Sequence, residues 1–257
     1  MIPYFELDTV HLGPLPIHTF GLCVAAGLVA GSSIAARVIQ REHGAAAGRA
    51  VRDGAFWALL GGLVGGHLMH VLGYHPELLR GDPWVLLRFW DGLSSMGGLV
   101  GGTAALVAYL HHKGHAARPL LNALALGTAP GWAIARIGCF LVHDHPGVHT
   151  HFFLAVMYPD GPRHDLGLDD LLVLTALSAL LFALARRPRP DGFLAGVLAV
   201  GYAVPRFLLD FLRATDVPLA DGRIFGLTPA QYVCMALVPL GLVLIVRPSY
   251  ARRRAAA

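Results

Sequence analysis

Long apolar segments separated by short polar connections run through the whole chain. Each is about as long as the roughly 20 residues that an α-helix needs to cross the hydrocarbon core of a bilayer. The pattern predicts an all-α polytopic membrane bundle of seven transmembrane helices. The third segment opens with Ser94-Ser95-Met96-Gly97-Gly98, so it could be a re-entrant or broken helix that lines a cavity. The segments are residues 17–38, 53–74, 94–112, 119–142, 167–185, 191–213 and 226–246.

The basic residues are distributed unevenly over the connections. Thirteen of the 20 lysines and arginines lie in the first, third, fifth and last connections, five lie in the other connections, and Arg136 and Arg206 lie within spans. Because basic residues concentrate on the cytoplasmic side of membrane proteins, we expect the N-terminus outside and the C-terminus in the cytoplasm. The thirteen are Arg37, Arg41, Arg49, Arg52, Lys113, Arg118, Arg186, Arg187, Arg189, Arg247, Arg252, Arg253 and Arg254.

Composition agrees with a membrane class. Hydrophobic residues make up 55% of the chain, charged residues 14%, and the mean hydropathy is +0.58, whereas soluble domains are about 25% charged. We therefore expect one integral membrane domain over residues 1–257, with an external loop at about 143–166. The net charge of +4 comes from arginines beside the spans, so nucleic acid is not an expected partner. Three cysteines in apolar stretches give no disulfide framework.

Two arginines within spans are the sharpest candidates for function. Arg136 and Arg206 are flanked by apolar residues, and Asp210 follows Arg206 by four residues on the same helix face. An internal salt bridge that only holds helices together would explain one of them. Two guanidinium groups in the outer half of the membrane also suit a lipid phosphodiester, which they grip bidentately. The same depth holds His18, Phe20, His67, His70, Ser95, Met96, Asp169 and Asp170.

The connection after the fourth segment is rich in histidine. Five of the 14 histidines lie between residues 143 and 164. A proton acceptor near neutral pH is what a thiol or hydroxyl nucleophile needs, although a solvated loop would have the same composition. Two His-x-His pairs could also bind a metal, but no regular ligand framework surrounds them, so we expect neither a metal nor a cofactor. The five are His143, His145, His149, His151 and His164.

These residues resemble the prolipoprotein diacylglyceryl transferase family over nearly the whole chain. The most specific parts are Arg136-Ile137-Gly138-Cys139-Phe140, which continues to Asp144 and Gly147, and the segment from Tyr202 to Arg213. Further similar segments run from Leu12 to Leu22, from Leu87 to Gly101 and from Gly226 to Gln231.

The resemblance implies a phospholipid-dependent transferase of lipoprotein biosynthesis in the bacterial inner membrane, with its active site toward the outer leaflet. Family members move the diacylglyceryl group of phosphatidylglycerol to the thiol of a lipobox cysteine, form a thioether and release glycerol phosphate. Carried over, Arg136 and Arg206 hold the phosphate, Asp144 and Asp210 stand in place of glutamates, and Gly147 matches a required glycine. Gly97, Gly98 and Gly138 belong to the implied phospholipid site.

The chain departs from the family pattern at four implied site positions. Phe20 replaces a tyrosine, Met96 a histidine, Cys139 an asparagine and His67 an arginine. Since methionine cannot accept a proton, the base must come from elsewhere.

His143, His145 and His164 are the candidates for that base, and we favour His145. Two other functions stay open. The chain could pass a lipid-derived group to another acceptor or to water, or it could be a lipid-binding or transporting member without the chemistry.

Overall fold

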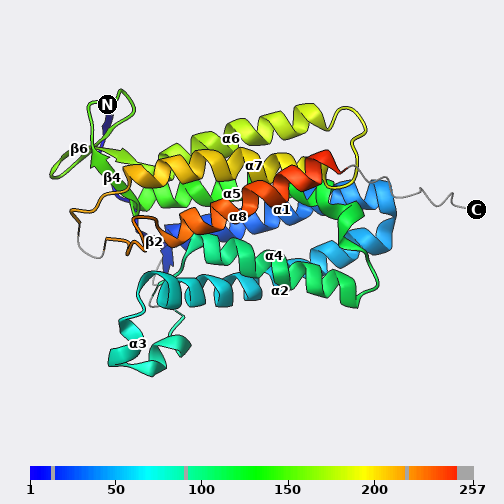
Figure 1. The fold of residues 1–257 in the computed structure, drawn as a ribbon, viewed down its shortest axis with the longest axis horizontal. Coiled ribbons are helices and arrows are strands. Elements are labelled where there is room, and N and C mark those ends of the chain that lie inside the picture. The colour runs from blue at the N-terminus through cyan, green and yellow to red at the C-terminus, as the bar shows by residue number, and fades with distance from the viewer. Residues whose placement is uncertain (13–14, 90–91, 218–219, 248–257) are drawn as a thin grey trace, which may run out of the picture.

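The computed structural model describes residues 1–12, 15–89, 92–217 and 220–247. Seven long helices in this part of the chain lie roughly side by side (Figure 1). Parts of two similar segments, Gly13, Pro14, Trp90 and Asp91, lie outside the described residues, as do Arg252, Arg253 and Arg254. The seven are α1 (Thr19–His43), α2 (Ala45–Leu68), α4 (Ser95–His112), α5 (Ala117–Val142), α6 (Leu166–Leu184), α7 (Phe193–Leu209) and α8 (Pro229–Val246).

Six helical segments of the described chain are long and apolar enough to cross a membrane, so the protein is a multi-pass membrane protein. The predicted third segment is α4, a continuous helix rather than the broken segment that its glycines allowed. Its 18 residues begin at Ser95 and follow the N-cap Ser94, whose side chain accepts a hydrogen bond from the amide of Gly97 at 3.3 Å. The six are Thr19–His43, Ala45–Tyr74, Ala117–Val142, Leu166–Leu184, Phe193–Leu212 and Pro229–Val246.

Glycines bring two pairs of helices into close contact. Helix α1 packs along α5, and α2 packs along α4. A Cβ atom on Gly27 would lie 2.2 Å from the carbonyl oxygen of Gly131, and one on Gly101 would lie 2.3 Å from that of Gly61. Small residues at a helix contact let backbones approach closely, which is the usual basis of helix association in membranes. The glycine content of the spans thus sets the packing of the bundle.

One end of the bundle carries a small β-sheet, and we call it the sheet end. The connection between α5 and α6 forms β4 (Pro146–His149), β5 (Val156–Tyr158) and β6 (Gly161–Asp165), where an irregular loop was expected. With β1 (Ile2–Pro3) they form a sheet in the order β1-β5-β6-β4. Strands of two to five residues with glycine, proline and charged residues lack the alternating apolar pattern that reveals a strand in a sequence.

Other short elements gather at the sheet end. Strands β2 (Thr9–Leu12) and β3 (Leu15–His18) pair as an antiparallel hairpin just before α1. A π-helical turn, η1 (Met69–Tyr74), continues α2. The chain then forms a projecting arm with α3 (Leu78–Gly81) and the 3₁₀ turn η2 (Pro83–Leu87) (Figure 1).

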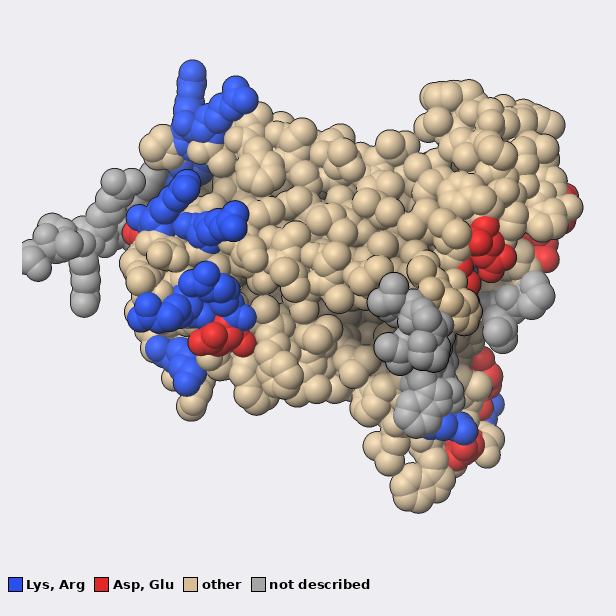
Figure 2. All heavy atoms as spheres, turned by 180° about the vertical axis from the view of Figure 1, so that it is seen from behind, with Lys and Arg blue, Asp and Glu red and all other residues tan. Residues whose placement is uncertain are grey.

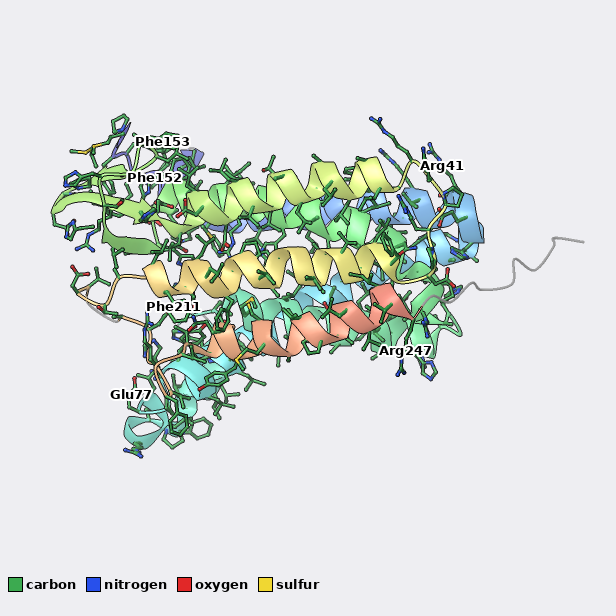
Figure 3. The ribbon with its side chains drawn as sticks, turned by 45° about the horizontal axis from the view of Figure 1, so that its top comes forward. Arg41, Glu77, Phe152, Phe153, Phe211 and Arg247 are labelled. Atoms are coloured by element: carbon green, nitrogen blue, oxygen red, sulfur yellow. The ribbon has the colours of Figure 1, made fainter. Side chains whose placement is uncertain are left out.

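Charged side chains separate along the long axis of the molecule. Figure 2 shows most of the visible lysine and arginine at one end and most of the acidic residues at the other, with an uncharged band between them. In Figure 3, Arg41 and Arg247 lie at the first of these ends, which we call the basic end. Glu77 and Phe153 lie at the opposite, sheet end. An uncharged band between two charged ends is what a bilayer-spanning protein presents to lipid.

Candidate active site

Arg136 and Arg206 meet at one carboxylate inside the bundle, near the sheet end. Arg136 Nη2 lies 3.0 Å from Asp170 Oδ2, and Arg206 Nη1 lies 3.2 Å from the same oxygen. Arg206 Nη2 also pairs with Asp210 Oδ1 at 2.8 Å. All four side chains are at most 3% exposed. Burying charges is tolerated when they are paired in this way. Three helices, α5, α6 and α7, are therefore joined by one ionic network.

Polar neighbours complete this network. Arg136 donates to Ser95 Oγ at 3.1 Å, to the Tyr202 hydroxyl at 3.4 Å and to Cys139 Sγ at 3.4 Å. The Nε atoms of Arg136 and Arg206 have no hydrogen-bond partner among the described residues. The Nε–H group of each guanidinium thus remains as a donor for a further acceptor, in addition to the ion pairs.

The N-terminus of α8 holds Asp210 in place. The Thr228 hydroxyl donates to Asp210 Oδ2 and accepts from the amide of Gln231 at 3.3 Å. The Gln231 side chain accepts from the amide of Thr228 at 2.9 Å and donates to the Phe207 carbonyl at 3.0 Å. This reciprocal capping arrangement begins α8 and fixes it against the end of α7. The orientation of Arg206 consequently depends on two helices.

Two cavities adjoin the arginines. A polar cavity of about 440 Å³ at the sheet end is lined by Arg206, among others. A larger cavity of about 660 Å³ is lined mainly by apolar residues of α1, α2, α4 and α5 and by Arg136. The linings of the two cavities share Leu93, Ser94, Ser95, Asp144 and His145. An apolar compartment that meets a polar one beside two guanidinium groups suits an amphipathic anion.

Asp144 and His145 stand at the junction of the cavities. The Asp144 side chain is 37% exposed but faces these cavities, and desolvation by the surrounding protein raises its pKa to about 6, against the opposing effect of Arg136. Desolvation, reinforced by Arg213, holds the pKa of His145 well below its ordinary value. The imidazole is therefore neutral near pH 7.

The hydrogen bond of His145 fixes its tautomer. Its Nδ1 lies 2.7 Å from the carbonyl oxygen of Asp144. Because a carbonyl oxygen only accepts and this contact is much shorter than the 3.4 Å contact of Nδ1 with Arg213 Nη2, Nδ1 carries the proton and Nε2 is left to accept one.

His143 is placed away from both cavities. It caps α5 in a left-handed conformation, with φ of 50°, and its side chain is 1% exposed. Its Nδ1 pairs with Asp165 Oδ2 at 2.6 Å, and the rings of Tyr4, Phe5 and Phe140 pack around it. A base must reach the proton that it abstracts. His143 therefore acts as an anchor for the turn that carries Asp144 and His145.

His164 and Gly147 also serve the scaffold. His164 pairs with Asp169 at 3.4 Å, stacks on Phe152 and lines neither cavity. A Cβ atom on Gly147 would lie 2.7 Å from the Cβ of His164, and the Gly147 carbonyl accepts from Arg163 at 3.1 Å. These two residues therefore line neither of the two cavities, and their sequence-predicted roles stay predictions.

The remaining predicted positions divide between cavity lining and packing. Phe20, Gly98 and Cys139 line the apolar cavity. Met96 is 1% exposed and belongs to the hydrophobic core, so it touches neither cavity. A Cβ atom on Gly97 would lie 2.4 Å from the Gly65 carbonyl oxygen, and one on Gly138 would lie 2.9 Å from the Cys23 Cβ. Gly97 and Gly138 accordingly allow close helix contact.

Three residues of the site were not assigned a role from the sequence. Asp170 bridges the arginines, Tyr202 contacts Arg136, and Arg213 lines the polar cavity with its Nη2 3.4 Å from His145 Nδ1. Arg213 also pairs with Asp221. Two of the three carry a signal in the sequence. Asp170 is an acid inside an apolar span, and Tyr202 precedes Arg206 by four residues on one helix face.

Comparison with known proteins points to one family. The family model for prolipoprotein diacylglyceryl transferase matches residues 8–247. The phosphatidylglycerol–prolipoprotein diacylglyceryl transferase of Methylococcus capsulatus is 33% identical over 263 residues, which cover 99% of this chain and 100% of that protein. The proteins of the same name from Ectopseudomonas mendocina and Azotobacter vinelandii are each 31% identical and cover 99% and 93% of this chain and 97% and 93% of their own length, respectively. The similarity therefore extends along the whole chain.

Proposed function

The chain belongs to the prolipoprotein diacylglyceryl transferase family, and we propose that it moves the diacylglyceryl group of phosphatidylglycerol to the lipobox cysteine thiol of a lipoprotein precursor. It is accordingly a membrane-embedded transferase of lipoprotein biosynthesis. The observation that carries this proposal is the pair of buried guanidinium groups, Arg136 and Arg206, that share Asp170 where an apolar cavity meets a polar one.

We propose that one phosphatidylglycerol molecule extends through both cavities, with its acyl chains in one and its headgroup in the other. The acyl chains occupy the apolar cavity, where Phe20 and Gly98 contribute to the lining. The phosphate lies beside Arg136 and Arg206, whose planar guanidinium groups suit phosphate oxygens. As the bond from carbon to phosphate oxygen breaks, charge grows on the leaving glycerol phosphate, and preorganised cations stabilise it. Asp170 and Asp210 keep the two cations oriented and prevent their mutual repulsion.

The acceptor thiol enters through the polar cavity and is activated beside His145 and Asp144. Only a few per cent of a free thiol is ionised at neutral pH, so the nucleophile needs assistance. Among the described histidines that line either cavity, His145 alone lines both. Its neutral imidazole with an unprotonated Nε2 is the form that assists a thiol.

We infer that the single membrane domain, residues 1–257, has seven spans, with α4 as the seventh. Helix α4 packs lengthwise against α2 and is as long as α8. The arginine-rich basic end then faces the cytoplasm, and the N-terminus and the sheet end face outward. This orientation sets the arginine pair at the outer leaflet of the bacterial inner membrane. The bacterial origin of the relatives supports this location.

Complementation of a conditional diacylglyceryl transferase mutant tests the proposed function. We expect the wild-type chain to restore growth and Arg206→Ala to abolish rescue. Arg80→Ala, at an exposed arginine of the arm outside both cavities, serves as the matched control and should rescue fully.

Failure of the wild-type chain to rescue, with normal membrane insertion, would refute the proposal. Phospholipid turnover by the purified protein without an acceptor peptide would then indicate hydrolysis or another acceptor. Lipid binding without turnover would instead indicate a binding or transport protein.

A further inference from the structure

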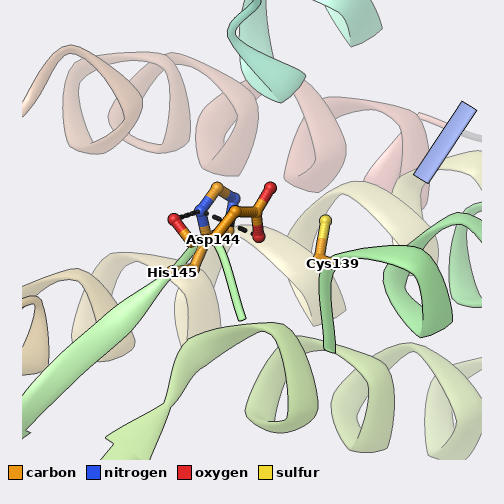
Figure 4. Close-up of side chains that lie close together, drawn as sticks. All are labelled: Cys139, Asp144 and His145. Carbon is orange, nitrogen blue, oxygen red and sulfur yellow. Dashed lines mark hydrogen bonds and ion pairs between the residues drawn. The ribbon is translucent and has the colours of Figure 1, made fainter. Parts of the chain in front are cut away.

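A thiol, a carboxylate and an imidazole converge at the junction of the two cavities. Cys139 lies in the last turn of α5, and the chain then reverses at His143 and returns Asp144 and His145 over it. One ligand atom from each of Cys139, Asp144 and His145 lies within 4.8 Å of the others. Figure 4 shows the three side chains gathered in one space. The turn that creates this arrangement is anchored by the 2.6 Å contact between His143 Nδ1 and Asp165 Oδ2.

The three donors match the chemistry of a zinc site. Zinc binds cysteine sulfur, histidine nitrogen and carboxylate oxygen in tetrahedral geometry, and a catalytic zinc keeps three protein ligands and one open position. Ligand atoms around a tetrahedral zinc lie roughly 3.5 Å apart. The three ligand atoms lie within 4.8 Å of one another, and Asp144 and His145 both border the cavities, so the set has to contract slightly around a bound ion.

The outer hydrogen bonds already have the form that a histidine ligand needs. Metal-bound histidine usually donates its other ring N–H to a carbonyl or carboxylate, which fixes the tautomer and the ring orientation. His145 Nδ1 donates to the Asp144 carbonyl oxygen at 2.7 Å, so Nε2 is the free ligand atom. Because His145 lines both cavities, its ring lies at their junction.

The local charge also permits a divalent cation. Arg136 and Arg206 are offset by Asp170 and Asp210. Arg213 is likewise offset by Asp221. A Cys139 thiolate and the Asp144 carboxylate are then the negative charges left to balance a bound Zn²⁺.

We propose that Cys139, Asp144 and His145 bind one Zn²⁺ whose fourth position takes the acceptor cysteine thiol. This inference rests on the proposed transferase function and names the means by which His145 assists the thiol. His145 then acts as a ligand rather than as a proton acceptor. The buried Met96 leaves position 96 without a proton acceptor, and a metal removes the need for one because a coordinated thiol loses its proton at neutral pH.

The transfer step balances with this site. The acceptor thiol coordinates and releases its proton to water in the polar cavity. The thiolate attacks the glyceryl carbon of phosphatidylglycerol, the C–S bond forms and the C–O bond to phosphate breaks. The electron pair of that bond stays on the phosphate oxygen, and the leaving glycerol phosphate takes up a proton from water. The thioether product no longer carries a thiolate, which weakens its hold on the metal and favours release.

Metal binding without substrates is the first test. The purified full-length protein, stripped with chelator and dialysed, is titrated with Zn²⁺ alone and then with Co²⁺, which reports thiolate ligation by a charge-transfer absorption band. We expect one ion per chain and a thiolate band that is lost in Cys139→Ser. Cys23→Ser, at a cysteine outside both cavities, should keep the band. Binding that does not saturate at one ion, or a band unchanged in Cys139→Ser, would overturn the site.

A second pair of variants guards against misfolding as the cause of a lost band. His145→Ala and Asp144→Asn should each lose tight Zn²⁺ binding while thermal unfolding of the metal-free proteins matches that of the metal-free wild type. If these variants keep wild-type Zn²⁺ affinity, the assigned ligand set is wrong.

Transfer assays separate this site from the proposed function. Metal-depleted protein should lose lipid transfer to a lipobox peptide and regain it when Zn²⁺ is restored. Full transfer by the metal-depleted protein would overturn the zinc proposal and leave the transferase intact. Stoichiometric Zn²⁺ binding without any transfer would instead keep the site and refute the proposed function.

Discussion

Asp170→Asn removes the charge that the two buried arginines share. At 3.0 Å and an effective dielectric constant of about 20, the pairing with Arg136 has a Coulomb energy of about 5 kcal/mol, and that with Arg206 is similar. Because desolvation offsets part of this energy, loss of one partner from a buried ion pair costs about 3–5 kcal/mol. For a chain of this size, that loss lowers the unfolding temperature by roughly 6–20 °C.

The assay is thermal unfolding of the purified protein in detergent, with and without phosphatidylglycerol. Asp169→Asn is the matched control, because Asp169 neighbours Asp170 on α6 but pairs only with His164 among the described contacts, at 3.4 Å. A partly exposed pair of this kind is worth at most about 1 kcal/mol. Phosphatidylglycerol should stabilise Asp170→Asn more than wild type, since its phosphate replaces the missing negative charge. Equal unfolding temperatures for the two variants would refute the shared-carboxylate interpretation, and equal lipid stabilisation would refute phosphate binding at the arginines.

Two further predictions concern the scaffold. Gly27→Ala should lower the free energy of unfolding by about 1–3 kcal/mol, because its Cβ would lie 2.2 Å from the Gly131 carbonyl oxygen of the partner helix. Gly21→Ala has open space around its Cβ and should be neutral. Chemical denaturation measures the free energy of unfolding of both variants, and equal values would contradict the packing of α1 against α5. Hydrogen bonds from Arg163 lower the pKa of Asp160 and of Asp216. A carboxylate whose pKa is lowered by folding stabilises the fold above its unfolded pKa, and that contribution disappears as pH falls through the folded pKa. The protection of β6 amides against hydrogen exchange, corrected for the pH dependence of the intrinsic exchange rate, should therefore fall below about pH 4, and protection that is unchanged or rises on acidification would contradict the assignment.

Hydrophobic patterning located the long helices well. All seven predicted segments correspond to helices, and six of them are long and apolar enough to cross a membrane, because an apolar run of about 20 residues has few alternatives in a bilayer. The depth argument placed Arg136 and Arg206 in one layer of the bundle, but it did not identify Asp170, which both arginines contact. The small sheet was missed because its strands are short and polar.

The separation of the histidines could not be predicted from the sequence. His143 and His145 are two residues apart, yet one is buried against Asp165 and the other faces the cavities. The left-handed conformation of His143 sends the chain back over α5, and such a conformation is uncommon for a residue other than glycine. The proximity of Cys139 to Asp144 has the same origin, so the spacing of these residues in the sequence did not reveal a set of metal ligands.

The central claim is that the two buried arginines form a phospholipid headgroup site that drives transfer to a thiol. The most direct measurement is mass spectrometry of a lipobox peptide after incubation with the purified protein in phosphatidylglycerol nanodiscs. We predict a peptide whose cysteine carries a diacylglyceryl thioether, with one glycerol phosphate released per peptide, and no product from Arg136→Ala or Arg206→Ala. An unmodified cysteine with the wild-type protein, or undiminished product from either arginine variant, would contradict the account.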